Sequence, residues 1–212
     1  MSTTPSDTID AVVAFHGHMC PGLAMGIRAA EVALSEIGPH SADEEVVAIV
    51  ETDMCSVDAV QFLTGCTFGK GNLLHRDHGK NAYTFVRRSD GRAVRISTRS
   101  GGWGIDAERL ELFAKVRAGL ASREERQRFF RLQQEHSRRI LSEPVEHIYD
   151  VREVQVTPPG AARVLASVDC EACTEPTMET RLRRLDGRQL CPPCFEAAAE
   201  GVTQLASPSV RR

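Results

Sequence analysis

Four cysteines near the carboxyl end place the strongest constraint on the fold of this chain. They form two C-x-x-C pairs, CEAC with Cys170 and Cys173 and CPPC with Cys191 and Cys194, separated by 17 residues. Two such pairs supply four thiolates, the arrangement that closes a tetrahedral Zn²⁺ site. A segment this small has too little apolar core to fold alone, so we expect zinc binding to supply most of its folding free energy.

The residues around these pairs predict a treble clef or zinc ribbon. The intervening METRLRRLDGRQL has a hairpin signal at Asp186-Gly187, and a helix is expected over residues 195–200. We therefore expect a zinc-finger module at residues 163–212 and a larger domain at residues 1–162. Two alternatives are buried cysteines without metal and a thioredoxin-like role for CPPC, but the matched second pair favours a closed structural site.

Composition excludes few classes of protein. The 212 residues are 42% hydrophobic with a net charge of -3, so no global charge favours nucleic acid. No basic segment precedes a long apolar run at the N-terminus, and no 18 consecutive apolar residues occur. We expect no membrane segment and a cytoplasmic protein, whose seven cysteines indicate metal binding or reactive thiols rather than disulfides.

The order of elements before residue 162 predicts an α+β fold with a mixed or antiparallel sheet and packed helices. Strands are expected over 44–53, on both sides of the turn Asp90-Gly91, and after residue 147. Helices are expected over 7–15, 21–37, 56–65, 106–118 and 122–141, the last with the capping box Ser122 to Glu125. The glycine-rich residues 66–82 are expected to form a long loop.

A second group of metal ligands lies near the N-terminus, in FHGHMCPG. His16, His18 and Cys20 alternate, so they share one side if the segment is extended, but they need not converge if it joins two helices. Cys20 precedes Pro21 and a predicted helix, where the amide dipoles favour a thiolate, and Cys55 precedes another helix. These residues predict a transition-metal or thiol site of His16, His18, Cys20 and Cys55, with Cys20, Cys55 and His18 as candidate catalytic groups.

The residues that flank Cys55 have several possible roles. Asp53 and Asp58 are candidate partners of the site, a base, or helix caps, with capping as the default. Cys66 follows the same predicted helix as a core thiol or a further reactive group. Trp103 walls a pocket or packs in the core.

The stretch GCTFGKGNL is similar to a phosphate-binding P-loop but fails in detail. It is one residue short, has Gly71 where Ser or Thr is needed, and follows a helix instead of a strand. We reject a nucleotide site and keep Lys70 and Asn72 as candidate contacts for a small anionic ligand. The glycines alone also explain a tight turn.

Three stretches together, FHGHMCPG, DMCSVDAVQFLTGCTFGKGNL and DHGKNA, resemble the FmdE family, which is named after formylmethanofuran dehydrogenase, over about residues 8–160. The resemblance implies an α+β core, often an intertwined homodimer, and a site drawn from His16, His18, Cys20 and Cys55. Some members also carry a C-terminal treble-clef zinc finger. Members occur in organisms that make no methane, so the family name is a poor guide to activity.

Three functions stay open from the sequence. The first is a metal-binding accessory or sensor protein, with a structural Zn²⁺, a second transition ion in the core, and a protein partner at the finger. The second is an enzyme that uses the core His/Cys site on a small anionic substrate. The third is a regulator whose finger binds protein or nucleic acid through Arg181, Arg183, Arg184 and Arg188, although these arginines also suit a solubilising surface.

Overall fold

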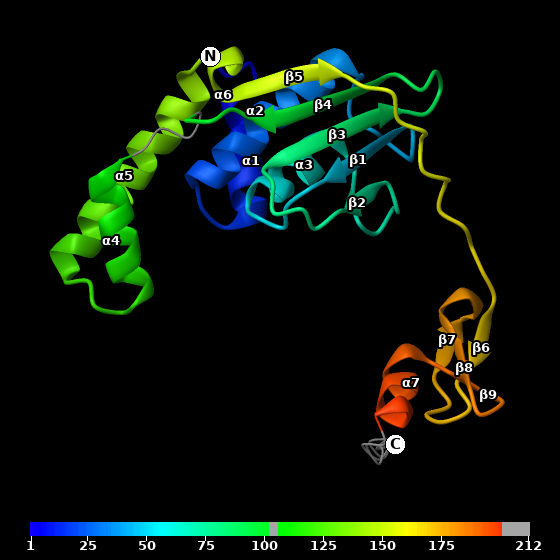
Figure 1. Ribbon diagram of the computed structural model, residues 1–212. Coiled ribbons are helices and arrows are strands. Elements are labelled where there is room, and N and C mark those ends of the chain that lie inside the picture. Colours follow the sequence, from blue (N-terminus) through cyan, green and yellow to red (C-terminus); the bar gives the residue numbers. More distant parts are fainter. Residues whose placement is uncertain (102–105, 201–212) are drawn as a thin grey trace. The chain divides into compact units, whose positions relative to one another are not determined.

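The computed structural model describes residues 1–101 and 106–200, and Trp103 lies outside the described residues. The chain forms two compact units, Met1–Ala162 and Arg163–Arg212 (Figure 1). They are described separately below.

The first unit is built on a five-stranded sheet with strand order β2-β1-β3-β4-β5. The strands are β1 (Val46–Val50), β2 (Leu73–His75), β3 (Ala82–Arg87), β4 (Ala93–Thr98) and β5 (Tyr149–Glu153). β1 and β2 are parallel, whereas the other neighbours are antiparallel. The predicted α+β fold with a mixed sheet is thus confirmed.

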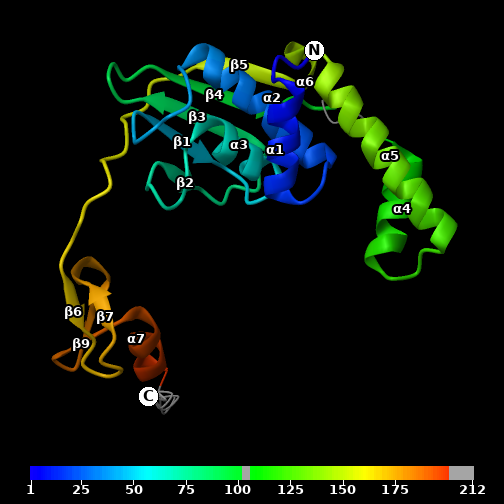
Figure 2. The same cartoon turned by 180° about the vertical axis from the view of Figure 1, so that it is seen from behind.

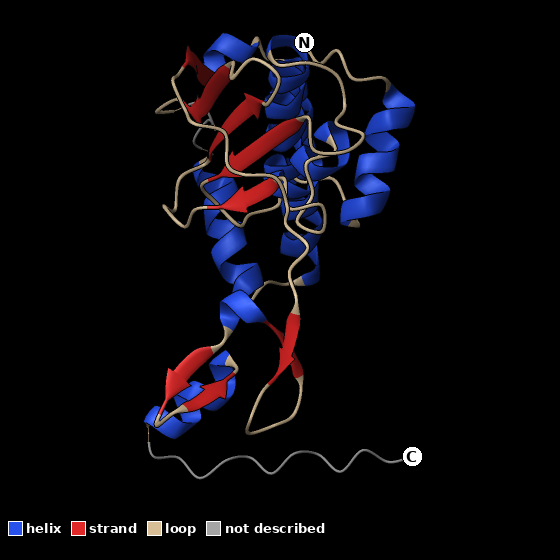
Figure 3. Ribbon diagram, turned by 90° about the vertical axis from the view of Figure 1, so that its right-hand side faces the viewer, coloured by secondary structure: helices blue, strands red, loops and turns tan. Residues whose placement is uncertain are grey.

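Helices cover one face of this sheet, and Figure 2 shows α1, α2 and α3 together in front of it. Figure 3 separates the strands from these helices by colour. The helices of the first unit are α1 (Ser6–His16), α2 (Pro21–Glu36), α3 (Ser56–Thr64), α4 (Ala107–Arg117), α5 (Arg123–Ser142) and α6 (Val145–Ile148). α2 lies at the centre, because it packs against α3, α5 and the sheet.

The main core lies between the sheet and α2. Alternate strand residues point to this side, as the period of a strand requires. The strand residues in this buried cluster are Val46, Ala48, Val50, Leu73, Tyr83, Phe85, Val94, Ile96 and Tyr149. α2 contributes mostly small side chains, among them Ala24, Ala29 and Ala33, and Tyr149 donates a hydrogen bond to the carbonyl of Met25 at 2.8 Å. Small residues let this helix approach the sheet closely.

Most expected elements are present, with one error. The turn Asp90-Gly91 joins β3 to β4, and Ser122 and Glu125 form the expected capping box of α5. The expected loop over 66–82 instead contains β2, which pairs in parallel with β1. Three residues are too few to show alternation in a sequence, and the pairing with β1 comes from a distant part of the chain.

α4 and α5 form a helical hairpin that extends beyond the sheet (Figure 1). A small cluster of Leu112, Phe129 and Leu132 holds the two helices together. Phe113 and Phe130 are exposed at 41% and 59%. Among the described residues, no helix combines the length and apolar character needed to cross a bilayer.

The second unit contains two short hairpins followed by a helix. Its elements are β6 (Ser167–Asp169), β7 (Pro176–Met178), the 3₁₀ turn Glu179–Arg181, β8 (Arg183–Leu185), β9 (Arg188–Leu190) and α7 (Pro192–Ala199). The expected hairpin at Asp186-Gly187 joins β8 to β9. α7 begins at Pro192, earlier than the expected residue 195, because prolines suit the first turn of a helix.

Candidate functional site

The four late cysteines converge in the second unit. Their sulfur atoms all lie within 4.8 Å of one another. Cys170 and Cys173 come from the turn after β6, Cys191 caps α7, and Cys194 lies in its first turn. Leu185, Leu190 and Phe195 pack beside them as the small core of this unit. Four sulfurs on two turns fit the tetrahedral coordination of a structural Zn²⁺.

Backbone amides prepare one of these sulfurs to bind a cation. Burial raises the pKa of Cys170, but the N–H groups of Cys173, Cys191 and Ala172 outweigh it and lower the pKa to about 6. The N–H of Cys191 donates to this sulfur at 3.2 Å. A thiolate that the chain itself stabilises is a ready zinc ligand.

The HGHMC segment joins two helices and is not a strand. α1 ends at His16, and Gly17 takes the left-handed conformation with φ 98°, which glycine adopts without strain. The chain is extended at Cys20, which caps α2. Of the two geometries left open by the sequence, the structure has the helix-to-helix junction, so the three side chains do not share one side by alternation.

Three ligand atoms nevertheless meet at this junction. One ligand atom each of His16, Cys20 and Cys55 lies within 4.8 Å of the others. Cys20 and Cys55 stand at the N-termini of α2 and α3, as expected. His18 is not in this group; its exposed ring lies against that of His16, with centroids 4.9 Å apart. We call His16, Cys20 and Cys55 the core cluster.

Asp58 orients the histidine of the core cluster. Nδ1 of His16 donates to Oδ2 of Asp58 at 2.7 Å, and Nε2 lies 3.9 Å from Sγ of Cys20. A carboxylate that accepts from the far ring nitrogen is the usual support of a metal-binding histidine. Asp53 is exposed and lies outside this arrangement. Of the two acids that flank Cys55, the structure therefore places Asp58 at the cluster.

The expected low pKa of Cys20 is wrong for the metal-free chain. Burial raises the pKa of this thiol to about 11, although the N–H groups of Leu23 and Gly22 act to lower it. The neighbouring Cys55 raises it further. A helix N-terminus thus does not make this buried thiol acidic, and a cation that binds here has to displace a proton.

Two glycines that the sequence analysis missed bring the core cluster together. A Cβ at Gly26 would lie 2.1 Å from the carbonyl oxygen of Ser56, and one at Gly22 would lie 3.1 Å from Cβ of Cys55. α2 can therefore approach the start of α3 only because these positions lack side chains. The G-x-x-x-G spacing in PGLAMG is the sequence signal of this close approach.

Lys70 and Asn72 do not contribute to the cluster. Nζ of Lys70 donates to the carbonyl of Ser41 at 2.8 Å, and Nδ2 of the fully buried Asn72 donates to the carbonyl of Val46 at 2.9 Å. Both side chains hold the loop before β2 in place. Cys66 is also buried, and its thiol donates to the carbonyl of Val46.

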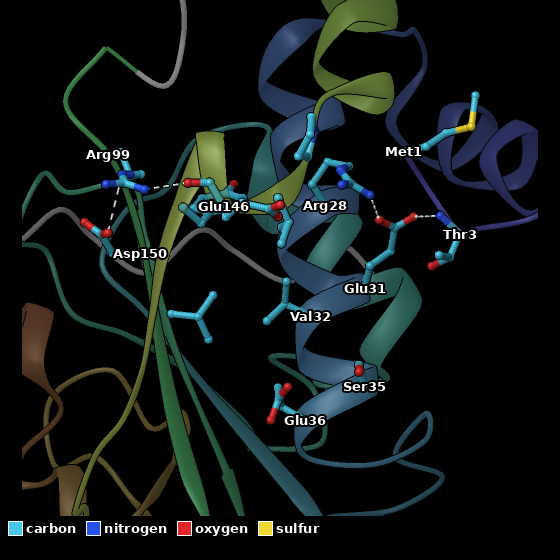
Figure 4. Close-up of a pocket in the computed structure, with 14 residues that line it drawn as sticks. Met1, Thr3, Arg28, Glu31, Val32, Ser35, Glu36, Arg99, Glu146 and Asp150 are labelled. Atoms are coloured by element: carbon cyan, nitrogen blue, oxygen red, sulfur yellow. Dashed lines mark hydrogen bonds and ion pairs between the residues drawn. The ribbon is translucent and has the colours of Figure 1, made fainter.

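A wide hollow of about 770 Å³ beside the C-terminal half of α2 is a different feature. Its charged groups pair with one another: Arg28 with Glu31, and Arg99 with Asp150 at 3.5 Å (Figure 4). Glu31 also accepts hydrogen bonds from Thr3 and Thr4, which holds the N-terminal segment against α2. No histidine or cysteine lines this hollow among the residues that the structure describes.

Comparisons with known proteins agree with the two units. The family described as FmdE, Molybdenum formylmethanofuran dehydrogenase operon, matches residues 15–150. The family described as Prokaryotic dksA/traR C4-type zinc finger matches residues 165–198. The second match and the four converging sulfurs together support a structural zinc in the second unit.

Two individual proteins are similar over most of this chain. A probable S-adenosyl-L-methionine-binding protein of Archaeoglobus fulgidus is 38% identical over 190 residues, which are 85% of this chain and 50% of that protein. The chain thus spans about half the length of this curated relative. An FmdE-like protein of the tungsten formylmethanofuran dehydrogenase type, from Syntrophus aciditrophicus, has a crystal structure similar to this one. It is 25% identical with a TM-score of 0.59, covering 91% of this chain and 92% of that chain. This chain belongs to the FmdE family and carries a C4 zinc finger after the family domain.

Proposed function

We propose that this protein is a metal-binding accessory protein that holds a transition ion in the core cluster in addition to its structural zinc. The observation that carries the proposal is the convergence of His16, Cys20 and Cys55 within 4.8 Å, from segments far apart in sequence. The hydrogen bond from His16 to Asp58 supports it, because it leaves Nε2 free for an ion.

The number of ligands distinguishes the two sites. Four protein ligands close a structural zinc site, whereas three leave one position for water or another molecule. A bound ion would supply a Lewis-acidic centre with one exchangeable position. Two sulfurs and one imidazole suit Zn²⁺ and other borderline or soft ions. The chain itself supplies the oriented imidazole and two thiols that lose their protons when the ion binds.

Element-resolved metal analysis tests this proposal. The purified protein should hold two metals per chain, and Cys20→Ser with Cys55→Ser should hold one. Cys66→Ala, which also removes a buried thiol, is the matched control and should still hold two. An unchanged metal count in the double variant would overturn the proposal, provided that circular dichroism shows an intact fold. Should that variant unfold, His16→Gln gives the same test, because it removes a ligand from a half-buried position.

A partner at the zinc finger is the second part of the proposal. Arg181, Arg184 and Arg188 are exposed, whereas Arg183 lies over the ring of Phe195 at 5.2 Å from its centroid. The three exposed guanidinium groups offer a positive surface to an acidic protein. Pull-down with the chain and with Arg181→Ala, Arg184→Ala and Arg188→Ala together checks this. Binding of nucleic acid that weakens steeply with salt would instead favour the regulator.

The homodimer stays a prediction from the resemblance, and light scattering during size-exclusion chromatography checks it. The enzyme alternative loses its expected anion contacts, because carbonyl groups already engage Lys70 and Asn72.

A further inference from the structure

A cavity of about 260 Å³ lies directly beside the core cluster. The turn between α1 and α2 forms one side of it through His18, Met19 and Cys20. α5 forms the other side, through residues far along the chain. The lining residues of α5 are Phe129, Phe130, Gln133 and Gln134. The metal site itself uses only Cys20 of these residues.

The spacing along α5 explains why these side chains act together. Phe130 lies three and four residues before Gln133 and Gln134, so all three share one face of the helix. α5 packs against α2, which begins immediately after Cys20. The sequence therefore places an aromatic and amide surface opposite a metal-ligating turn.

Two aromatic surfaces favour a planar occupant. Phe129 is buried and stacks on Phe113, with centroids 6.0 Å apart and rings at 28°, so its position is fixed. Phe130 is 59% exposed and only 5.8 Å from Phe129. The ring of His18 is exposed on the opposite side. Flat faces of this kind bind rings by offset or edge contacts.

The amide groups favour an occupant that both donates and accepts hydrogen bonds. Oε1 of Gln133 accepts from Arg109 at 3.2 Å, which leaves its NH₂ group as a donor. The side chain of Gln134 makes no hydrogen bond within residues 1–101 and 106–200 and is exposed. An amide offers two donors and one acceptor oxygen, which complements another amide.

The charges around the cavity disfavour an anion. No Asp, Glu, Lys or Arg of the described residues lines it. With a divalent ion bound, the thiolates of Cys20 and Cys55 and the carboxylate of Asp58 carry three negative charges against two positive ones. The volume also falls just below the range of about 300–1,000 Å³ that is usual for ligand pockets, which favours a small molecule.

We infer that this cavity binds a small, uncharged, planar molecule with a carboxamide group, its ring against Phe130 and its amide at Gln134. The inference deepens the proposed function, on which it rests, because a molecule held here lies next to Cys20 and hence to the ion that Cys20 would hold. It replaces the anionic ligand that the sequence predicts with an uncharged one.

Isothermal titration calorimetry of the full, metal-loaded chain tests the inference with three probes of similar size. Benzamide is planar and uncharged, benzoate is planar and anionic, and cyclohexanecarboxamide has the amide without the planar ring. Benzamide should bind at least about tenfold more tightly than either of the others, which corresponds to about 1.4 kcal/mol. Equal or tighter binding of benzoate would overturn the inference, as would no heat from benzamide at millimolar concentration.

Variants of the two exposed wall residues locate the site. Phe130→Ala and Gln134→Leu should each weaken benzamide binding about tenfold, because each removes one of the two contacts. Phe68→Ala and Gln127→Leu are matched controls at exposed positions away from the cavity and should bind like the parent chain. Equal affinity of the wall variants and the controls would overturn the inference.

Metal content measured on the same samples separates this inference from the proposed function. Two metals per chain without benzamide binding would overturn the cavity inference and leave the core metal site standing. One metal per chain would overturn the core metal site, and benzamide binding lost in Phe130→Ala and Gln134→Leu would then still support the cavity.

Discussion

The zinc finger and the core cluster use the same kinds of ligand in opposite ways. The finger draws four sulfurs from residues 170–194, whereas the core cluster draws three ligands from residues 16–55 and needs α2 packed on α3. Short C-x-x-C turns bring their own sulfurs together, so the finger is a local structure. The core cluster exists only after the surrounding domain has folded.

The two units also differ in what stabilises them. The buried cluster of the finger consists of Leu190 and two of the cysteines, Cys170 and Cys191. The first unit buries a large apolar cluster between its sheet and α2. We conclude that metal binding folds the finger, whereas the first unit folds by burial of apolar surface and then presents a preformed site.

The largest expected effect comes from removing the finger metal. Cys170→Ser with Cys191→Ser should unfold the second unit, because structural zinc contributes about 10–16 kcal/mol to such small modules. Nuclear magnetic resonance should show loss of dispersed amide signals for residues 163–200 and retention of those from the first unit. Retained dispersion in the finger would break the comparison.

The next effect comes from the contact between α2 and α3. Gly26→Ala should lower the free energy of unfolding of the first unit by about 3 kcal/mol, because its Cβ would lie 2.1 Å from the carbonyl oxygen of Ser56. It should also weaken metal binding at the core cluster and leave the finger unchanged. Chemical denaturation measures the stability change.

Gly69→Ala is the matched control for this change. Its Cβ meets no atom within 4 Å, so the stability should stay within about 0.5 kcal/mol of the parent. A stable Gly26→Ala chain with normal core metal content would show that the helices can separate without loss of the site.

A smaller effect is expected at the buried ion pair of α2. Burial raises the pKa of Glu31, but hydrogen bonds from Ser2 and Thr4 and the charge of Arg28 outweigh it, so the pKa lies below its ordinary value of 4.5. The carboxylate therefore stabilises the fold at neutral pH. Glu31→Gln should cost about 2 kcal/mol at pH 7, because hydrogen bonds to a charged acceptor are replaced by weaker ones.

The pH dependence of this loss has a definite sign. A group with a lowered folded-state pKa contributes fully above its ordinary pKa, and the contribution disappears as the pH falls through the folded value. The difference in melting temperature between Glu31→Gln and the parent should therefore shrink below pH 4.5. Glu36→Gln, at an exposed ion pair with Arg92, is the control and should show little change at any pH.

The smallest effect tests the support of the core ligand. Asp58→Asn should weaken metal binding at the core cluster by about tenfold, because an amide holds His16 less firmly than a carboxylate does. Competition with a chromophoric chelator measures this affinity. Asp53→Asn is the control, since Asp53 is exposed beside the same helix. Equal affinities of the two variants would show that Asp58 has no role in orienting His16.

Sequence patterns predicted most of the fold because most of its elements carry local signals. Pro21 and the capping box of Ser122 and Glu125 mark helix starts, and Asp90-Gly91 marks a hairpin. β2 carried no such signal, because its three residues are defined by pairing with β1. The role of Gly22 and Gly26 also depends on a neighbour that is distant in sequence.

The sequence by itself determined the finger ligands, the α+β class and the placement of Cys20 and Cys55 at two helix starts, because spacing and capping act over a few residues. Only the tertiary structure decided which ligands meet. It brought His16, Cys20 and Cys55 together, placed His18 outside their group and held Asp58 against His16. It also raised the pKa of Cys20, since burial depends on what the rest of the chain packs around a residue.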